Sequence, residues 1–347
     1  MSSGSTIVEG IDLHRVEKWL NASGIDGRIT GPRLLRGGTQ NILVRFHVGT
    51  RDVVLRRPPR KPRPRNDELL LREARVLGAL AETSVPHPRL VAACSDRDVL
   101  GDAVFLVMDA IDGYNPFDVD PQVLARDGAR DRVASGLVDA LATIASVDPD
   151  KAGLGGFGRP DGFLERQTTR WTDDYRSYRK IDGYAGDELP GFDAVREYLQ
   201  GDIPADFRVG LMHGDYHPGN VLCSPDDSVA AVVDWEMATI GDPLLDLGRF
   251  LAGWPDDHET IVPGVALWAG GQVPPASALA EHYAARSGAD MTRLDWYVVM
   301  GCFKLGIVLE GTYARACTGR ADAATGQLFH GMAVRLFQRA SRLVAAQ

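Results

Sequence analysis

The segment Leu211-Met-His-Gly-Asp-Tyr-His-Pro-Gly-Asn220, followed fourteen residues later by Asp234 in Val232-Val-Asp-Trp-Glu236, decides how this sequence is interpreted. Its Pro-Gly pair breaks any helix, so the stretch from Asp215 to Asn220 is predicted to be a loop. Kinase-type sites use a loop Asp at the hydroxyl, an Asn five residues later on metal, and a second metal-binding Asp after a short hairpin. Ordinary turn chemistry explains any one of these residues, but it explains the complete set poorly. The pattern predicts phosphoryl transfer, with Asp215 at the hydroxyl and Asn220 and Asp234 on Mg²⁺.

Longer runs around these residues carry a family resemblance. HGDYHPGNVL at 213–222 and VVDWEMATIGDPLLDLGRFL at 232–251 resemble the aminoglycoside phosphotransferase family of small-molecule kinases. Within that family the chain most resembles the branch whose animal members are fused to acyl-CoA dehydrogenase domains. FGRPDGFLERQTTRW at 157–171 and FKLGIVLEGTYAR at 303–315 are similar to that branch as well. The resemblance therefore covers nearly the entire chain.

The resemblance implies an α+β protein with the two-lobe, protein-kinase-like fold. Residues 1–112 would form the N-lobe, a small antiparallel sheet with one main helix, and residues 113–347 a larger, mostly helical C-lobe. The residue pattern agrees, because short β-rich runs occupy the first hundred residues and helical spacing dominates after residue 119. Apolar residues at that helical spacing are Val133, Leu137, Leu141 and Ile144.

Composition favours a soluble globular protein. A chain of 347 residues with 44% hydrophobic content is long enough for about two core-bearing units. No apolar run approaches the roughly 18 residues of a membrane span, and the polar start lacks a signal-peptide hydrophobic region. We predict a cytoplasmic protein without a membrane partner. Cys94, Cys223, Cys302 and Cys317 are widely spread and are predicted to be reduced structural thiols.

Charge is unevenly distributed along the chain. Residues 1–112 carry 17 Lys and Arg against 14 Asp and Glu, a net charge of +3, so the total of −9 leaves −12 for the remainder. An acidic second half argues against a nucleic-acid partner, because phosphate neutralisation needs clustered basic side chains. A well-solvated surface explains the acidity more simply than a cation-binding cleft does.

Three short strands are predicted at Arg33–Arg36, Ile42–Val48 and Asp52–Arg57. Between the first two lies a Gly-Gly turn, whose glycines would let backbone N–H groups approach phosphate oxygens. A plain hairpin turn has the same letters, but the position ahead of the other kinase residues favours a phosphate loop. The residues of this candidate loop are Gly37, Gly38, Thr39 and Gln40.

The third strand ends in two arginines where a kinase places the lysine that holds the α- and β-phosphates. Arginine is a forked, permanently charged donor that also suits phosphate. The strand register favours Arg56, and Arg57 remains an alternative. A helix is predicted at Asp67–Glu82, and its inward face includes Glu73. Because a buried carboxylate needs a partner, Glu73 is predicted to pair with Arg56, although it could instead reach solvent at the edge of the stripe.

The N-cap of this helix is predicted to be Asn66 or Asp67. The basic, Pro-rich stretch at 57–65 before it is predicted to be extended, and either grips an anionic substrate tail such as the phosphates of coenzyme A or is simply solvated. Phe105–Met108 is predicted as a buried strand leading to the lobe connector. The resemblance implies that adenine meets the carbonyl of Asp109 and the amide of Ile111, although a plain linker fits the same letters.

The C-lobe motifs separate this chain from protein kinases. A short hairpin is predicted over Val221–Asp234, and the segment Gly241–Gly248 follows too soon for a long phosphorylatable activation segment. Asp242 and Asp246 in that segment are predicted to be structural, capping a helix and bracing the catalytic loop. The two histidines of the catalytic loop, His213 and His217, are predicted to pack or hydrogen-bond rather than bind metal.

We predict transfer of the γ-phosphoryl group of Mg-ATP to a small-molecule hydroxyl. The family implies aminoglycosides, which the acidic stretches Thr172–Asp174 and Pro255–Glu259 would attract, whereas the branch implies a hydroxy acid or hydroxyacyl-CoA. A catalytically silent nucleotide-binding scaffold remains an alternative from another class. A metal-dependent hydrolase fits less well, because Asn between two acids suits a nucleotide–Mg²⁺ site. The candidates on the substrate side are Gln167, Arg170, Trp171, Lys304, Glu310, Tyr313 and Arg315.

Overall fold

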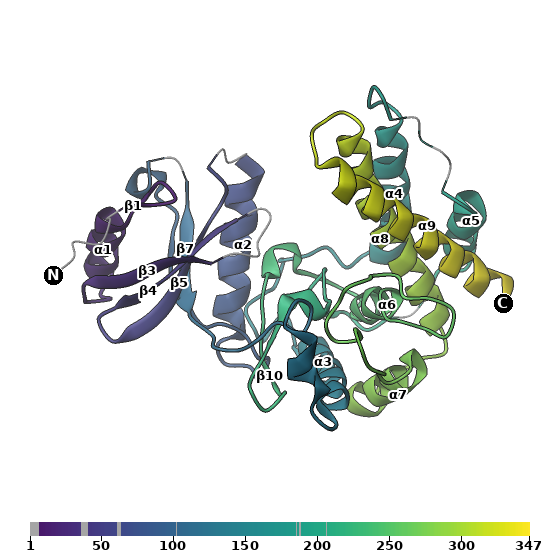
Figure 1. The fold of residues 1–347 in the computed structure, drawn as a ribbon, viewed down its shortest axis with the longest axis horizontal. Coiled ribbons are helices and arrows are strands. Elements are labelled where there is room, and N and C mark those ends of the chain that lie inside the picture. The colour runs from purple at the N-terminus through teal and green to yellow at the C-terminus, as the bar shows by residue number, and fades with distance from the viewer. Residues whose placement is uncertain are drawn as a thin grey trace. The chain divides into compact units, whose positions relative to one another are not determined.

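The computed structural model describes residues 7–35, 41–60, 64–101, 103–184, 186, 189–205 and 207–347. The chain divides into two compact units (Figure 1). The first unit comprises Met1–Gly113, Ala152–Leu154 and Ala230–Ala238, and the second comprises Tyr114–Lys151, Gly155–Val229 and Thr239–Gln347. The N-lobe predicted from the sequence did not include the two later segments. One of them carries Asp234.

The first unit is built on a five-stranded antiparallel sheet with the strand order β3-β4-β5-β7-β6. Its strands are β3 (Ile29–Leu35), β4 (Ile42–Val48), β5 (Arg51–Arg57), β6 (Leu90–Cys94) and β7 (Phe105–Asp109). The short strands β1 (Ile7–Val8) and β2 (Ile11–Asp12) form a separate pair. All the strands predicted in this region are present, and β4 has the predicted bounds.

Alternation along β5 assigns its side chains to two faces of the sheet. Val53 and Leu55 join the apolar cluster that includes residues of α1 (Leu13–Ala22), so this face is covered by α1. Arg56, the residue after Leu55, lies on the opposite face, where it pairs with Glu73 of α2 (Pro64–Leu80). Figure 1 shows α1 and α2 on the two sides of this sheet. Because the side-chain period of a strand is two, Arg57 cannot take the same position.

The start of α2 differs from the prediction. The helix begins at Pro64, so Asn66 and Asp67 lie within its first turn and neither is the N-cap. A proline suits the first helical position because its missing N–H would have no intrahelical partner there. The helix ends at Leu80, whose carbonyl accepts both the backbone N–H and the hydroxyl of Thr83, at 2.9 and 2.7 Å. The predicted helix at Asp67–Glu82 is therefore displaced by two to three residues.

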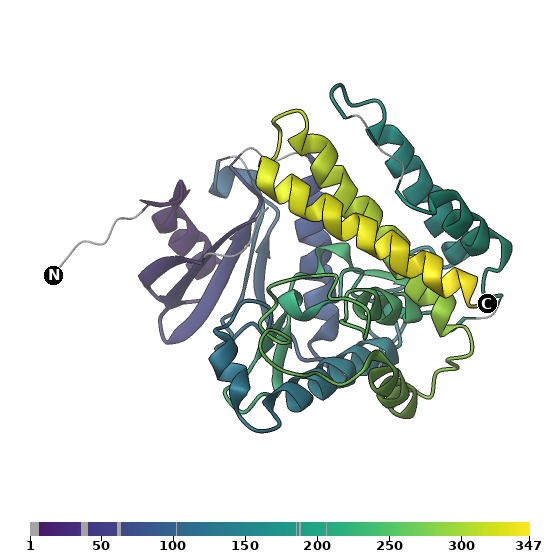
Figure 2. The same cartoon turned by 45° about the vertical axis from the view of Figure 1, so that its right-hand side comes forward.

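The second unit is mostly helical, as predicted. The four apolar residues singled out in its first long helix are buried along α3. Its helices are α3 (Ala129–Ser146), α4 (Phe163–Tyr178), α5 (Phe192–Gly201), α6 (Leu244–Ala252), α7 (Ala276–Ser287), α8 (Leu294–Ala316) and α9 (Ala323–Ala345). Figure 2 shows α9, in yellow, lying along α8. Short 3-10 turns occur in both units, at η1 (Arg97–Val99) and η4 (Trp235–Met237) in the first and at η2 (Pro121–Ala125) and η3 (Pro218–Asn220) in the second.

Helix α8 is the core helix of this unit. By length and composition it is the one helix within the described ranges that could cross a membrane, yet 72% of its most apolar window is buried inside the protein. It packs closely against α6, where glycines allow the two backbones to meet. A Cβ on Gly248 would lie 2.2 Å from the carbonyl oxygen of Tyr297. The apolar character of α8 therefore serves internal packing.

Short strands place the catalytic loop. Strand β8 (Gly210–Met212) pairs antiparallel with β11 (Thr239–Gly241), and the loop follows β8 directly. After the loop come β9 (Val221–Cys223) and β10 (Val229–Val232), joined by a turn in which the Ser224 N–H donates to the Ser228 carbonyl at 2.8 Å. The segment after β10 is fixed to the first unit, because the Val232 N–H donates to the carbonyl of Pro86 at 2.8 Å.

Candidate active site

A buried carboxylate fixes the start of the catalytic loop. Asp246 on α6 is 2% exposed, and its two oxygens accept the backbone N–H groups of His213 and Gly214 at 2.6 and 2.9 Å. Asp242 accepts the N–H of Leu244 at the start of α6 at 3.0 Å, and it also accepts the hydroxyl of Tyr297. The predicted bracing and capping roles of Asp246 and Asp242 are confirmed.

Asp215 lies in this loop with its side chain 43% exposed. Its backbone N–H donates to Nδ1 of His213 at 3.3 Å, and its carbonyl accepts Nδ2 of Asn220 at 3.0 Å. His217 accepts the N–H of Gly219 at Nδ1, at 3.1 Å. Both histidines thus take part in hydrogen bonds of the loop, as predicted. The amide nitrogen of Asn220 is thereby engaged within the loop.

Two cations of the second unit act on Asp215. Nη2 of Arg249, on α6, lies 3.4 Å from a carboxylate oxygen of Asp215, and Nζ of Lys304, on α8, donates to the carbonyl of Gly214 at 2.6 Å. Burial alone would raise the pKa of Asp215, but the surrounding positive charges, led by Arg249, lower it below its ordinary value. Burial lowers the pKa of Lys304, against the attraction of Asp215 and Asp246. Asp215 is therefore held in its charged form.

In the first unit, Arg56 joins three carboxylates. Its Nη1 donates to Glu73 of α2 at 2.9 Å, and its Nη2 donates to Asp234 at 2.7 Å and to Glu236 at 3.1 Å. The predicted Arg56–Glu73 pair is present, and the alternative that Glu73 reaches solvent is wrong, because Glu73 is 1% exposed. Arg57 instead donates to the carbonyl of Pro58 at 2.9 Å. Strand register and hydrogen-bond geometry therefore identify Arg56, and not Arg57, as the partner of Glu73.

The peptide at Asp234 is shaped by this cluster. Asp234 has a φ of 68° and a left-handed backbone, which Asp tolerates better than most residues. The following N–H, of Trp235, donates to Glu73 at 3.2 Å. Burial raises the pKa of Glu73 to about 7, against the lowering by Arg56. The pKa of Arg56 is also raised, because the charges of Glu73 and Asp234 outweigh burial, which alone would lower it.

The donor chemistry fits Mg²⁺, which prefers carboxylate and carbonyl oxygens and keeps several other ligands. Within the first unit, Asp234 supplies a carboxylate that is 39% exposed. Asp234 and Glu236 share one guanidinium nitrogen, and Oε2 of buried Glu73 has no hydrogen-bond partner among the described residues. A further cation would balance these oxygens. No group of three or more His, Cys, Asp or Glu within the described ranges could hold a metal ion.

The substrate-side candidates divide into two groups. In the first group, two cations lie over the ring of Trp171: the Arg170 guanidinium is 4.8 Å and the Lys304 ammonium 5.6 Å from the ring centroid. One turn earlier on α4, Nε2 of Gln167 donates to the carbonyl of Phe163 at 3.3 Å. Lys304 joins this group to the catalytic loop. These residues remain candidates for the acceptor side.

The second group lies further along α8. Glu310 is fully buried, and its oxygens accept the Tyr184 hydroxyl at 2.6 Å and pair with Nδ1 of His330 at 2.8 Å. Tyr313 stacks on His330 with ring centroids 4.5 Å apart. Arg315 is exposed and donates to the hydroxyl of Thr312 at 2.8 Å. The internal partners of Glu310 give it a packing role that the sequence did not reveal.

The residues predicted to contact the phosphates and adenine of the nucleotide lie in two parts of the chain. Gly37, Gly38, Thr39 and Gln40 lie outside the described residues. Asp109 ends β7, and its carboxylate accepts Nε of Arg51 at 2.7 Å. Ile111 lies in the half-buried connector that follows. The proposed adenine contacts of Asp109 and Ile111 involve backbone groups and stay predictions.

Two residues of the site were not named from the sequence. Glu236 follows Asp234 by two positions in Asp-Trp-Glu, and Arg249 follows Asp246 by three on α6. A spacing of three puts Asp246 and Arg249 on one helix face. Since Asp246 was predicted to brace the catalytic loop, this spacing could have indicated that Arg249 also faces the loop. No comparable rule indicates that Glu236 turns back toward Arg56.

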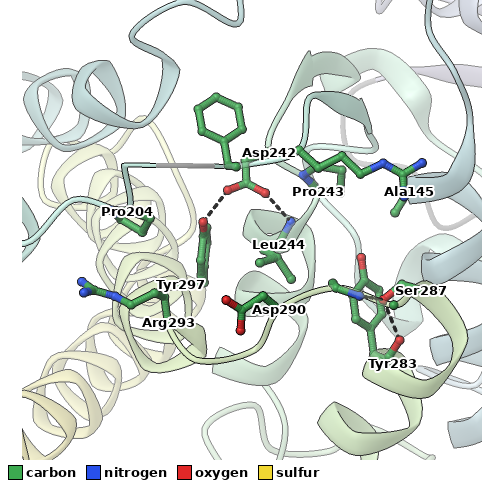
Figure 3. A pocket seen from close by; sticks show the side chains of 14 residues that line it. Ala145, Pro204, Asp242, Pro243, Leu244, Tyr283, Ser287, Asp290, Arg293 and Tyr297 are labelled. Atoms are coloured by element: carbon green, nitrogen blue, oxygen red, sulfur yellow. Dashed lines mark hydrogen bonds between the residues drawn. The ribbon is translucent and has the colours of Figure 1, made fainter.

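A cavity of about 510 Å³ lies in the second unit (Figure 3). Its wall includes Asp242, Pro243, Tyr283 and Tyr297, and none of its lining residues belongs to the catalytic loop. The Asp242 carboxylate in that wall is already paired with Tyr297 and with the N–H of Leu244 (Figure 3). Size alone therefore does not make this cavity the active site.

Comparisons with known proteins bear on these groups. The model of the phosphotransferase enzyme family matches residues 32–297. The chain is 30% identical over 322 residues to acyl-CoA dehydrogenase family member 11 of Gallus gallus, covering 90% of this chain and 40% of that protein. It is 26% identical over 307 residues to member 10 of Mus musculus, covering 84% of this chain and 27% of that protein. The chain thus spans less than half the length of these curated relatives.

Solved structures show the same fold. A candidate aminoglycoside phosphotransferase from Ralstonia eutropha has a TM-score of 0.77 at 25% identity, covering 96% of this chain and 99% of that one. The macrolide 2'-phosphotransferase MphH from Brachybacterium faecium has a TM-score of 0.61 at 20% identity, covering 91% of this chain and 97% of that one. A thermostable mutant of aminoglycoside phosphotransferase APH(4)-Ia, in a ternary complex with ADP and hygromycin B, has a TM-score of 0.57 at 17% identity, covering 90% of this chain and 98% of that one. The predicted α+β fold is confirmed.

Proposed function

Because the chain belongs to the phosphotransferase enzyme family, we propose that it transfers the γ-phosphoryl group of ATP to the hydroxyl of a small molecule. The observation that carries this proposal is the charged Asp215 beside Asn220, in a loop braced by buried Asp246. The ADP bound by a structural neighbour supports nucleotide use. A silent scaffold would not need this charged carboxylate to be maintained next to two cations.

The chain supplies positioning and charge in this reaction, which needs little covalent help. Asp215 orients the acceptor hydroxyl and takes its proton late in the transfer. Arg56, held by Glu73, neutralises the phosphates that are not transferred. Mg²⁺, when held by Asn220 and Asp234, would neutralise phosphate charge during transfer.

Charge near Asp215 supports an anionic acceptor. Arg249 makes one hydrogen bond within the described ranges, to Asp215, so its guanidinium keeps spare N–H groups. Together with Lys304, it presents positive charge at the place where the hydroxyl must sit. A carboxylate or phosphate on the acceptor would be attracted there, whereas the ammonium groups of an aminoglycoside would be repelled.

One of the two acidic stretches expected to attract a polycation gives weaker support. In Pro255–Glu259, Asp256 pairs with Arg339 at 2.8 Å and Glu259 pairs with Arg342. The charges of Asp256 and Glu259 are therefore already paired within the second unit. We therefore favour a hydroxy acid or hydroxyacyl-CoA as the acceptor, and aminoglycosides are the second candidate.

The test is Mg-ATP-dependent ADP release with matched acceptors. One set contains hydroxy acids and hydroxyacyl-CoA esters with the hydroxyl at successive carbons, a second contains the methyl esters of the same hydroxy acids, and a third contains aminoglycosides. We expect release with the first set, little with the uncharged esters, and none from Asp215→Asn. Release only with aminoglycosides would refute the anionic acceptor, and release with no set despite ATP binding would favour the silent scaffold.

Arg249→Gln separates two roles for the spare guanidinium. If Arg249 binds the acceptor anion, the substitution raises the acceptor KM and leaves the KM of the uncharged ester unchanged. If Arg249 neutralises the transferring phosphoryl group, kcat falls equally for both acceptors. The first result is expected, because the hydrogen bond of Arg249 is to the residue that orients the acceptor.

A further inference from the structure

The arrangement around Arg56 raises a problem for nucleotide binding. The proposed function assigns Arg56 to the phosphates and Asp234 to the metal, yet the two side chains are paired with each other at 2.7 Å. A Mg-nucleotide must therefore exchange their partners, with the Asp234 oxygen turning to the metal and Nη2 of Arg56 turning to a phosphate. During this exchange the buried guanidinium would lose a charged partner, which is costly away from water.

Glu236 is placed to offset that loss. Its Oε2 accepts the same nitrogen, Nη2 of Arg56, at 3.1 Å. The carboxylate of Glu236 is also fixed from another side, because Nδ2 of Asn41 donates to the same Oε2 at 3.1 Å. Asn41 directly follows the candidate phosphate loop in the sequence and begins the approach to β4. Glu236 thus connects Arg56 to Asn41, the residue that precedes β4.

We propose that Glu236 is a positioning residue for nucleotide binding, which keeps Arg56 in place while Asp234 changes its partner from Arg56 to the metal. This inference rests on the proposed function, since it takes from it the roles of Arg56 and Asp234. The other anchor of the guanidinium, Glu73, holds a different nitrogen, Nη1, at 2.9 Å, and so does not restrain the nitrogen that is released. The role therefore belongs to Glu236 among the three carboxylates.

Glu236→Gln tests this role with little change in shape. A glutamine keeps one acceptor oxygen but loses the charge, and a hydrogen bond without the charge has about half the strength. We expect the Kd of Mg-ADP to rise about tenfold, which is about 1.4 kcal/mol. Glu259→Gln is the matched control, because Glu259 also pairs with an arginine, and the side chains of Glu236 and Glu259 are 19% and 15% exposed. The control is expected to bind Mg-ADP like the unmodified protein.

The metal dependence distinguishes positioning from general loosening. Isothermal titration calorimetry with ADP is carried out with Mg²⁺ and again with EDTA. Without metal, Asp234 has no reason to leave Arg56, so the effect of Glu236→Gln should shrink to less than about twofold. In an Asp234→Asn background the exchange is absent, and Glu236→Gln should again have little effect.

Three results would overturn the inference. One is unchanged Mg-ADP binding by Glu236→Gln, and another is an equal loss with Mg²⁺ and with EDTA, which is expected of a merely structural role. The third is a loss that persists in Asp234→Asn, because it would make Glu236 a metal ligand in its own right. Failure of the unmodified protein to bind Mg-ADP would instead overturn the proposed function, and this inference with it. The acceptor is not needed for any of these measurements.

Discussion

Replacing Asp246 by Asn should uncouple the catalytic loop from α6. The carboxylate accepts two backbone N–H groups at 2.6 and 2.9 Å while it is 2% exposed. Asparagine retains one acceptor oxygen, but its NH₂ group then faces a backbone N–H. Two hydrogen bonds to a charged group, about 1.5–3 kcal/mol each, become one neutral bond of about 1 kcal/mol. Part of this loss is recovered, because a buried charge no longer has to be desolvated.

The expected net destabilisation is about 2–3 kcal/mol. Displacing the loop by about 1 Å should also lower kcat/KM about 100-fold. Urea unfolding and the ADP-release assay measure the two effects. Asp226→Asn is the matched control, because Asp226 also accepts two hydrogen bonds, from the N–H and hydroxyl of Ser228, but is exposed. It should change the stability by less than about 0.5 kcal/mol. Equal stability of the two variants, or full activity of Asp246→Asn, would refute the bracing role.

Two other predictions concern helix packing and pH. Gly248→Ala should destabilise the protein by about 3 kcal/mol in urea unfolding, because its Cβ would meet the Tyr297 carbonyl at 2.2 Å. Gly201→Ala is the control, because a Cβ there would have nothing within 4 Å, and it should stabilise the protein by about 0.5 kcal/mol. Similar changes in stability for the two variants would contradict the close contact between α6 and α8. With its pKa raised to about 7, Glu73 should lose its charge below that pH, so kcat/KM should fall on acidification as the hold on Arg56 weakens. Because the folded state binds this proton more tightly than the unfolded chain does, Glu73 should add stability as the pH falls from about 7 to its ordinary value of 4.5. Glu73→Gln should lack both pH-dependent steps, and their persistence in that variant would assign them to another group.

Rules about local sequence were sufficient to predict β4, the pairing of Arg56 with Glu73, and the catalytic loop. Strand periodicity placed β4, and the inward carboxylate of α2 identified the partner of Arg56 before any coordinates. The Pro-Gly pair likewise predicted that the stretch from Asp215 to Asn220 is a loop. These features depend on spacing within one element or on a single buried charge that must be paired.

Contacts between distant segments were beyond these rules. The attachment of Ala230–Ala238 to the first unit depends on bonds from Val232 and Trp235 to residues about 150 positions earlier. The position of Glu310 could not be inferred either, because nothing in the helical pattern reveals that Tyr184 and His330 surround it. The start of α2 was missed because proline was taken as a helix breaker, although it suits the first turn.

The most direct test of the central claim is ³¹P NMR of a reaction containing Mg-ATP and a hydroxy acid or hydroxyacyl-CoA accepted in the ADP-release assay. We expect a phosphomonoester signal to grow in step with ADP, and to be lost with Asp215→Asn while that variant still binds Mg-ADP. ADP formed together with inorganic phosphate alone, or an unchanged phosphomonoester signal from Asp215→Asn, would contradict transfer to a hydroxyl oriented by Asp215.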